Sequence, residues 1–477
     1  MRRCWSCAGV TTASPRPTGW PRWPPPHPAA RPRPCPAGPT WCRSPGPPRW
    51  PRASRRSSAA PGRAGRVTTV AASDGDAAWA HVLAHVVDGG HLARGEDLTT
   101  LVDDAVRPVG LTAQVLVVDL AQRMFVPIGD AADQQVRVVG TMAGRAYQLG
   151  EILPGLDDAG ARVLWVPVLD GTDRAGVMRI GLGDRDDDAD LRRWVWILAG
   201  LTGHLLMTKI VYSDRLRRWR SNGPLSLASE LLWQMLPPRT FATDRVVVAA
   251  LLEPHDRVAG DAYDYNVDGD VIDLAVFDAL GHDLRAGLTT ALAITAVRNA
   301  RRDGETDLRA IAARADEAVL SQAGPHQFAT AVLARLDTAT GVLEFLLAGH
   351  PAPLLVRDGR VVKQLASAPR LPLGLTIPGP PPAVGREQLE PGDRLLLYSD
   401  GIVEARDVDG AFFGEDRLVE FTEHAAADHL SAPETLRRLG AAVLAHQDGR
   451  LQDDATLVLV DWATGAHLSM FPTDAGG

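Results

Sequence analysis

Aspartates stand at the ends of apolar, strand-like runs in four separate segments of the C-terminal half of the chain. They are Asp261 in "VAGDAYD", Asp278 in "LAVFDALGHDL", Asp400 in "LLLYSDG", and the adjacent Asp453 and Asp454 in "LQDDATLVLV". Any one of these segments is typical of an ordinary turn. A carboxylate that ends a buried strand, however, is costly unless it is paired or holds a metal. Taken together, the four segments predict one cluster of carboxylates.

Such a cluster would repel itself at neutral pH, because an unperturbed aspartate has a pKa of about 3.9. Hard cations relieve that repulsion, and ligands that are all oxygen favour Mg²⁺ or Mn²⁺ over zinc. Two such ions, about 3.5–4 Å apart, activate water and orient a phosphoryl group. The residue types therefore predict a two-metal centre for phosphate chemistry.

The elements that must position these acids are mostly strands. From Val246 onward, apolar runs alternate with turns such as "VDGD", "DTATG" and "RDGR", which are typical of hairpins. Helical patterns cover residues 285–302, 306–322 and 432–447. The economical prediction is an α+β fold with antiparallel sheets and a helical layer.

The preceding part of the chain predicts a second domain at residues 79–212. A helical segment, several antiparallel strands and a long helix over 188–220 resemble the pattern of GAF sensor domains. A ligand-binding pocket and a scaffold without ligand both fit this pattern. In the long helix, apolar residues recur at three- and four-residue steps: Leu191, Val195, Leu198, Leu201 and Leu205. This stripe either packs against its own domain or joins two copies of the chain in a homodimer.

Residues 1–73 have a different composition from the rest. Residues 1–66 hold 13 arginines, no acidic residue and all four cysteines. We expect this leader to be disordered, and we expect the native start to lie near Val67 or Val70. The net charge of −8 does not indicate nucleic-acid binding. No apolar run predicts a signal peptide or a membrane span, so the expected location is the cytoplasm.

An ordered set of motifs across residues 246–461 carries a family resemblance. The motifs are "VAGDAYDY", "VFDALGHDLRAGL", "AGHPAPLLV", "PLGL", "DRLLLYSDGIVEA" and "DDATLVLV". The set resembles the metal-dependent serine/threonine protein phosphatases (PPM, type 2C), in the bacterial SpoIIE/RsbU branch. The resemblance implies a two-sheet antiparallel β-sandwich flanked by helices over residues 239–463, with metals between the sheets at one end. A helical linker over 213–238 would precede it, and a flexible tail over 464–477 would follow.

The resemblance also implies roles for the acids. Asp261 and Asp400 match metal ligands, and Asp278 matches the acid that bridges two Mn²⁺ or Mg²⁺ ions, helped by the carbonyl of Ala279. In the last motif Asp453 is the expected ligand, with Asp454 beside it. The implied reaction is in-line attack of water on phosphorus, without a phosphoenzyme.

This chain departs from the family pattern at several positions. Ala259 replaces a glycine, and Asp283 stands where a glycine is usual and adds a charge near the site. His282 is interpreted as a turn residue, with proton donation as the alternative.

No residue clearly matches the phosphate-binding arginine of eukaryotic relatives. Arg257 and Arg285 are only candidates by position. His350 and Tyr263 are expected to support packing.

The branch implies a substrate, namely a phosphorylated STAS-domain antagonist of an anti-sigma factor, in a partner-switching pathway. Two alternatives stay open. One is a catalytically weak sensor or scaffold with the same fold, which Asp283 favours. The other is a phosphoesterase for nucleotides or small phosphates, which the lack of a P-loop and of histidine-rich motifs disfavours.

Overall fold

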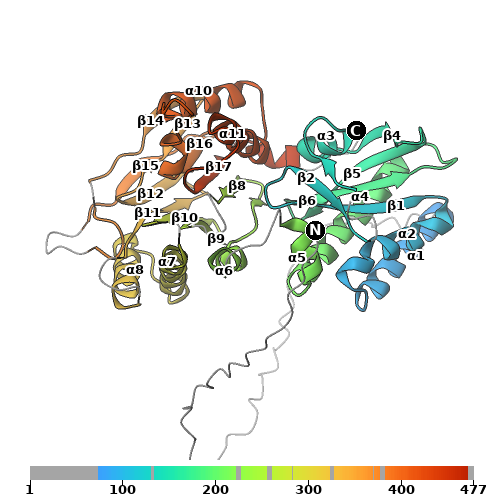
Figure 1. Ribbon diagram of the computed structural model, residues 1–477, viewed down its shortest axis with the longest axis horizontal. Coiled ribbons are helices and arrows are strands. Elements are labelled where there is room, and N and C mark those ends of the chain that lie inside the picture. Colours follow the sequence, from blue (N-terminus) through green and yellow to red (C-terminus); the bar gives the residue numbers. More distant parts are fainter. Residues whose placement is uncertain are drawn as a thin grey trace, which may run out of the picture. The chain divides into compact units, whose positions relative to one another are not determined.

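The computed structural model describes residues 74–129, 134–221, 227–254, 260–281, 283–322, 327–368, 370–375 and 382–470. The predicted leader, with its cysteines and the expected start near Val67 or Val70, lies outside the described residues. Two regions, each built around its own sheets, are described in turn (Figure 1).

The N-terminal region is a six-stranded antiparallel sheet with helices on both faces. Its strand order is β3-β2-β1-β6-β5-β4. The strands are β1 (Thr112–Val118), β2 (Met124–Pro127), β3 (Val136–Arg137), β4 (Leu153–Leu156), β5 (Arg162–Asp170) and β6 (Asp173–Gly181). The helices are α1 (Asp74–Gly90), α2 (Leu98–Val106), α3 (Met142–Leu149) and α4 (Ala189–Ile210), with short 3-10 turns η1 (Gly95–Asp97) and η2 (Arg107–Val109).

Strand alternation assigns the two faces of this sheet. Val115 and Val117 of β1 join a buried cluster with α1, α2 and α4, whereas Leu116 and Val118 join another with Tyr147 of α3. The α/β domain predicted from the sequence is therefore present, and its assignment to the GAF class stays a prediction.

The apolar stripe of the long helix is buried inside this region. Leu191, Val195 and Leu198 are at most 1% exposed, and Leu201 and Leu205 pack against the same cluster. Of the two readings of the stripe, packing against its own domain is the one observed.

The prediction of one continuous helix over 188–220 is wrong. Asp188 caps its start as expected, accepting from the backbone N of Leu191 at 2.8 Å, but the helix ends at Ile210. A second helix, α5 (Asp214–Arg220), follows at an angle of 108°. Ser213 caps α5 by accepting from the backbone N of Leu216, whose side chain is fully buried. The turn lets Leu216 reach the core, which a straight helix would prevent.

Within the described residues, no single helix is long and apolar enough to cross a membrane. Helices α4 and α5 reach that length and composition only when counted together across their bend.

The end of the predicted linker packs on the C-terminal region. Leu232 of α6 (Leu227–Met235) is buried in the core that contains α7. Arg298 of α7 donates to the carbonyl O of Met235 at 2.6 Å, and the hydroxyl of Tyr263 donates to the carbonyl O of Pro237 at 3.1 Å. These bonds fix the entry of the chain into the sandwich.

The C-terminal region is a sandwich of two antiparallel sheets. The five-stranded sheet has the order β15-β12-β11-β10-β9, and the six-stranded sheet has the order β14-β13-β16-β17-β8-β7. The first contains β9 (Asp261–Asp268), β10 (Val271–Ala279), β11 (Ala329–Asp337), β12 (Val342–Ala348) and β15 (Gly385–Gln388). The second contains β7 (Thr240–Ala242), β8 (Val246–Glu253), β13 (Leu354–Arg357), β14 (Arg360–Gln364), β16 (Arg394–Tyr398) and β17 (Ala455–Trp462).

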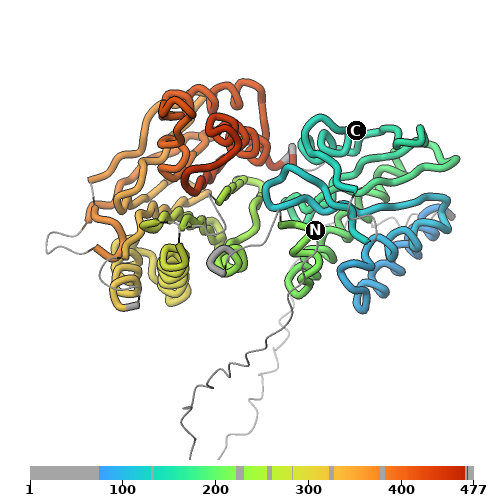
Figure 2. The backbone as a smooth tube through the Cα atoms, viewed as in Figure 1, coloured from blue at the N-terminus to red at the C-terminus, as the bar shows by residue number. Residues whose placement is uncertain are grey.

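Helices cover both outer faces of the sandwich (Figure 1). Helices α7 (Leu284–Arg302) and α8 (Leu308–Gln322) pair as a hairpin on the five-stranded sheet. The backbone tube in Figure 2 shows the two helices side by side. Helices α10 (Gly414–Ala427) and α11 (Ala432–His446) lie on the other sheet, and α9 (Asp400–Val403) is a single turn after β16. The turn η3 (Ala466–Met470) occupies the start of the expected tail, and Met470 is buried.

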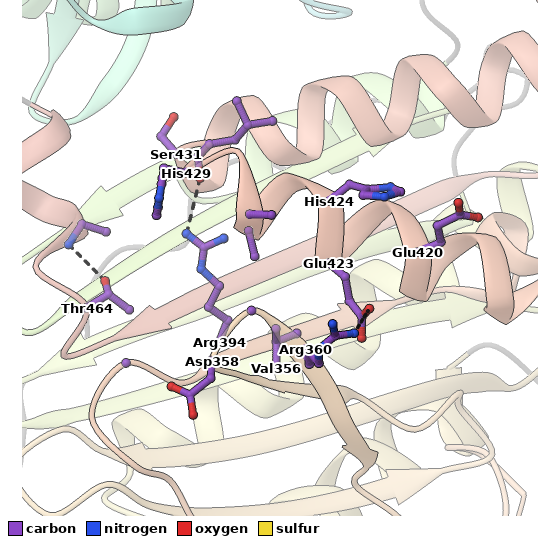
Figure 3. A pocket seen from close by; sticks show the side chains of 16 residues that line it. Val356, Asp358, Arg360, Arg394, Glu420, Glu423, His424, His429, Ser431 and Thr464 are labelled. Atoms are coloured by element: carbon purple, nitrogen blue, oxygen red, sulfur yellow. Dashed lines mark hydrogen bonds and ion pairs between the residues drawn. The ribbon is translucent and has the colours of Figure 1, made fainter.

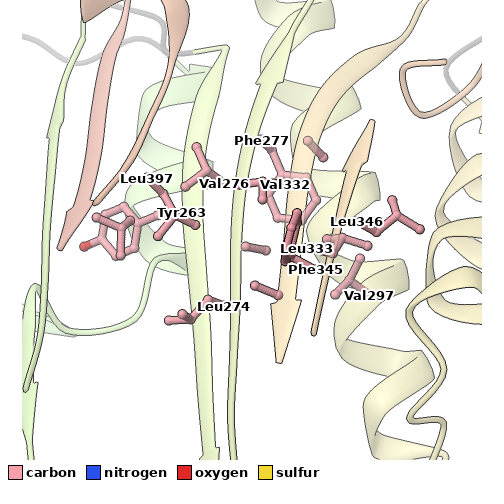
Figure 4. Close-up of a cluster of buried hydrophobic side chains, with 14 of the residues drawn as sticks. Tyr263, Leu274, Val276, Phe277, Val297, Val332, Leu333, Phe345, Leu346 and Leu397 are labelled. Atoms are coloured by element: carbon pink, nitrogen blue, oxygen red, sulfur yellow. The ribbon is translucent and has the colours of Figure 1, made fainter. Parts of the chain in front are cut away.

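This layering explains the continuous apolar runs in the sequence. On β8, Val248 and Ala250 face the core between the sheets, whereas Val247 and Ala249 face α11. A strand covered on both faces has no polar alternation, as the runs indicate. Figure 4 shows part of the largest buried cluster, which contains side chains from both sheets and from α7. The predicted α+β sandwich is thus confirmed.

We expect Leu333→Ala, in the middle of β11, to lower the free energy of unfolding by about 2–5 kcal/mol, because it removes buried methyl groups and leaves a cavity. Leu333 is 1% exposed. Urea denaturation measures the loss. Val362→Ala is the control, since Val362 is 50% exposed on β14 and should change stability by no more than about 0.5 kcal/mol. Equal effects of the two substitutions would contradict the assignment of the core.

Candidate metal centre

The five-stranded sheet brings two of the predicted acids face to face. Strand β9 begins at Asp261 and β10 ends at Ala279, and Asp261 and Asp278 are direct partners in the antiparallel ladder. Direct cross-strand partners have Cβ atoms about 4.5–5.5 Å apart on the same face of the sheet. Asp261 is 2% exposed and Asp278 is half-buried. The sheet register alone therefore sets these two carboxylates beside each other.

The six-stranded sheet supplies the other three acids from neighbouring strand ends. The backbone N of Ser399, after β16, donates to the carbonyl O of Thr456 at 3.0 Å, and the backbone N of Thr456 donates to the Ser399 hydroxyl at 3.0 Å. A Cβ on Gly401 would lie 1.9 Å from the carbonyl O of Asp454. Only glycine lets the turn that carries Asp400 approach the Asp453–Asp454 pair so closely.

A hydrogen bond from Gly260 to Asp454 links the two sheets at this end. The backbone N of Gly260 donates to Oδ2 of Asp454, and the Thr290 hydroxyl of α7 donates to the carbonyl O of Gly260. A Cβ on Gly260 would lie 2.5 Å from the carbonyl O of Gly281. Asp454 is 2% exposed whereas Asp453 is exposed, so Asp453 is the acid of the pair that a cation can reach.

The charges of these acids act on one another, and the pKa values of three of them are raised. Burial raises the pKa of Asp278 to about 7, and the charges of Asp400 and Asp453 add to the rise. Burial also raises the pKa of Asp261 well above its usual value, followed by the charges of Asp278 and Asp454. The pKa of Asp400 is raised by burial and then by Asp453. Without a counter-ion, the group resists full ionisation.

This donor set fits hard divalent cations. It consists of carboxylates, and Oδ2 of Asp261 is buried with no hydrogen-bond partner among the described residues. Buried polar atoms normally have partners, so this orphan oxygen is available to an ion. In the part of the chain that the structure describes, no group of three acidic, histidine or cysteine side chains already has the spacing of an assembled metal site.

Of the residues that depart from the family pattern, the structure describes Asp283. Asp283 caps α7, because its carboxylate accepts from the backbone N atoms of Arg285 and Ala286 at 2.9 and 3.0 Å. Arg285 is exposed at the start of the same helix. Tyr263 is buried, and its hydroxyl anchors Pro237, which agrees with the packing role expected for it. Arg257, Ala259 and His282 lie outside the described residues.

Sequence reasoning missed the hydroxyl groups around the acids. Ser399 and Thr456 lie beside Asp261 and counteract the rise of its pKa. The Thr330 hydroxyl donates to Oδ2 of Asp278 at 3.5 Å. Ser399 and Thr456 lie within two residues of a predicted acid in the sequence, and Thr330 is the partner of Asp278 on the neighbouring strand. The motifs "YSDG" and "DDAT" hold the only signal that could have identified two of them.

A cavity of about 720 Å³ lies elsewhere in the sandwich region. It is lined by the turn between β13 and β14 and by the turn between α10 and α11 (Figure 3). Arg394, which lines it, begins β16, whereas Asp400 follows the other end of that strand. None of the five acids lines this cavity, so it is separate from the candidate metal centre.

Comparison with known proteins finds relatives of the C-terminal region. Residues 268–463 match the family model "Stage II sporulation protein E (SpoIIE)". The phosphoserine phosphatase RsbU of Bacillus subtilis is 22% identical over 236 residues, which cover 50% of this chain and 69% of RsbU. Protein IcfG of Synechocystis sp. is 28% identical over 134 residues, which cover 28% of this chain and 20% of IcfG. The chain thus matches only a fifth of the length of IcfG. Among solved structures, the SiaA-PP2C domain of Pseudomonas aeruginosa is 25% identical and covers 45% of this chain and 85% of its own, with a TM-score of 0.40.

The raised pKa of Asp278 predicts how the metal-free protein responds to pH. Its folded value of about 7 lies above the value of about 3.9 in the unfolded chain, so the folded state retains the proton more strongly. The contribution of Asp278 to the free energy of unfolding is fully present below pH 4 and is lost as the pH rises through 7. Between pH 5.5 and 7 the loss should approach about 2 kcal/mol.

Urea denaturation in EDTA at several pH values measures this loss. Asp278→Asn cannot titrate and should show a flatter pH profile, and Mn²⁺ should restore stability to the unmodified protein near pH 7. Identical pH profiles for the two proteins would show that Asp278 is not in a crowded carboxylate cluster.

Proposed function

We propose, from the match of residues 268–463 to the family model "Stage II sporulation protein E (SpoIIE)", that this chain is a metal-dependent protein serine/threonine phosphatase. The observation that carries the proposal is the convergence of Asp261, Asp278, Asp400, Asp453 and Asp454 from two sheets. Four segments far apart in sequence contribute to this group. Asp261 and Asp278 pair across the sheet, and the charges of the other acids add to the raised pKa values of these two.

Within this proposal the acids have distinct tasks. Asp261, Asp278, Asp400 and Asp453 would hold two Mn²⁺ or Mg²⁺ ions, with the carbonyl of Ala279 as a further ligand. Asp454 is held by the backbone N of Gly260, so its task is to keep the two sheets in register beside the ligands. Bound ions would stabilise the negative charge on the phosphoryl oxygens and would lower the pKa of a water molecule bound to them.

The orientation of the carboxylates is the contribution of the protein itself. Ladder pairing holds Asp261 against Asp278, and the Gly401 turn holds Asp400 against Asp453. Asp283, the residue that favoured a catalytically weak scaffold, caps α7 with its carboxylate. Its extra charge thus has a structural use, and the helix N-terminus compensates it.

Hydrolysis of an aryl phosphate should require Mn²⁺ or Mg²⁺, and it should stop in EDTA. Asp278→Asn removes a ligand charge while it preserves size, so turnover should fall by at least about 100-fold while the fold persists. Asp268→Asn is the matched control, because Asp268 is exposed at the other end of β9 and should retain full turnover. Activity that survives thorough chelation, or a fully active Asp278→Asn variant, would exclude the proposal.

For the substrate, we propose a phosphorylated STAS-domain antagonist of an anti-sigma factor, in a partner-switching pathway. Support comes from the SpoIIE match and from the similarity to RsbU, a phosphoserine phosphatase. The candidate centre lies at strand ends, where a phosphoserine on a folded partner could reach the half-buried Asp278 and the exposed Asp453.

Release of phosphate from a phosphorylated STAS protein should be at least about tenfold more efficient, in kcat/KM, than release from nucleotides at equal Mn²⁺, because a protein contacts more of the surface around the site. Phosphate assays with both substrates measure the ratio. A preference for nucleotides would favour the small-molecule phosphoesterase instead.

For regulation, we propose that the N-terminal region is a GAF-like sensor and that the chain forms a homodimer near the linker. The apolar stripe of α4 is buried, so the dimer contact would use exposed apolar residues such as Ile197, Val211 and Tyr212. Sedimentation that finds only monomers would exclude the dimer.

A further inference from the structure

A buried histidine lies behind the candidate metal centre, and the site described so far does not use it. His350 follows β12 in the motif "AGHPAP" and is 7% exposed. Its Nδ1 lies 2.7 Å from the hydroxyl O of Thr330, and its Nε2 is buried with no hydrogen-bond partner among the described residues. A buried polar ring with one strong contact indicates a specific task for that contact.

The backbone holds this ring in place from both sides. Gly349 pairs with Ala331 in an isolated parallel bridge, which holds the main chain of the motif beside β11, and the His350 ring contacts Thr330 of the same strand. Gly349 has φ +68°, and a Cβ there would lie 2.7 Å from Cγ of Pro372. A side chain at position 349 would therefore be strained as well as crowded. The geometry around His350 is fixed rather than adaptable.

Thr330 links this ring to the acid at the centre of the cluster. Thr330 is the ladder partner of Asp278 on the side opposite Asp261, and its hydroxyl donates to Oδ2 of Asp278 at 3.5 Å. A hydroxyl has one proton and can point it at only one acceptor. If Thr330 donates to Asp278, it must accept from Nδ1–H of His350.

The ring has one proton to place. Burial lowers the pKa of His350 to about 4, although a hydrogen bond with the backbone of Tyr398 opposes the fall, so the imidazole is neutral at neutral pH and carries one N–H. The backbone of Tyr398 and the hydroxyl of Thr330 therefore compete for that N–H. Donation from Thr330 to Asp278 requires the proton to lie on Nδ1.

We infer that His350 is a positioning residue that holds the Thr330 hydroxyl toward Asp278 and thereby orients this carboxylate for a divalent cation. Two hydrogen bonds make this link: His350 Nδ1–H donates to Thr330 Oγ1, and Thr330 Oγ1–H donates to Asp278 Oδ2. Hydrogen bonds to a ligating carboxylate raise metal affinity by fixing its orientation. The inference rests on the proposed metal-dependent function, but its test does not require turnover.

The test measures Mn²⁺ binding, with free Mn²⁺ quantified by its paramagnetic resonance signal. Glutamine at position 350 can match only Nε2, whereas asparagine can place an N–H near the position of Nδ1. We expect His350→Gln and Thr330→Val each to raise the Kd for Mn²⁺ by about tenfold. His350→Asn and Thr330→Ser, which retain the required N–H and hydroxyl, should bind Mn²⁺ close to the unmodified protein. The double variant Thr330→Val/His350→Gln should bind no more weakly than either single variant, because each single substitution already removes the hydrogen-bond link from His350 to Asp278.

Thermal melting of each metal-free variant separates positioning from loss of fold. Should His350→Gln fail to fold, the Thr330→Val and Thr330→Ser pair decides the question. Unchanged Mn²⁺ affinity of Thr330→Val, equal weakening by His350→Asn and His350→Gln, or additive losses in the double variant would overturn the inference. Unmodified protein that binds Mn²⁺ and hydrolyses no phosphoprotein would reject the proposed function, while these affinity ratios would still decide the role of His350.

Discussion

Mutual repulsion among five carboxylates is the constraint that shapes the sandwich region. Asp261 and Asp278 are direct partners across β9 and β10, and the charges of Asp400, Asp453 and Asp454 act on one or the other. Burial makes this arrangement more expensive still, as the raised pKa values indicate. A fold that brings such groups together must hold them by forces from elsewhere, because the groups themselves oppose the contact.

Those forces come from two sheets that are covered on both faces. Strands β8 and β17 are buried along almost their whole length, with alternate side chains in the inner core and under α11. Large apolar area is therefore removed from water on both sides of each sheet, and this area can offset the local cost at the acidic end. A stable scaffold with one destabilised end is the usual arrangement for a functional site.

Small polar groups around the acidic end of the sandwich hold the carboxylates in defined orientations. The Ser399 and Thr456 hydroxyls lie beside Asp261, the Gly260 backbone N donates to Asp454, and Thr330 donates to Asp278. Two glycines, at positions 260 and 401, let main chain approach main chain at distances that no side chain would permit. Asp261, Asp278 and Asp454 thus each have a neighbour that restricts their orientation, and some of these neighbours link the two sheets.

Sequence alone determined the fold class and the acids, because both follow from local patterns. Uninterrupted apolar runs with glycine- and aspartate-rich turns predict buried antiparallel strands, and Asp261, Asp278, Asp400 and Asp453 stand out at the ends of such runs. Tertiary structure decided what depends on distant partners. The break between α4 and α5 follows from the burial of Leu216, and the apolar stripe around Leu198 is core because its own sheet covers it. The contact of His350 with Thr330 joins the segment after β12 to β11, and neither motif by itself indicates that these two segments lie side by side.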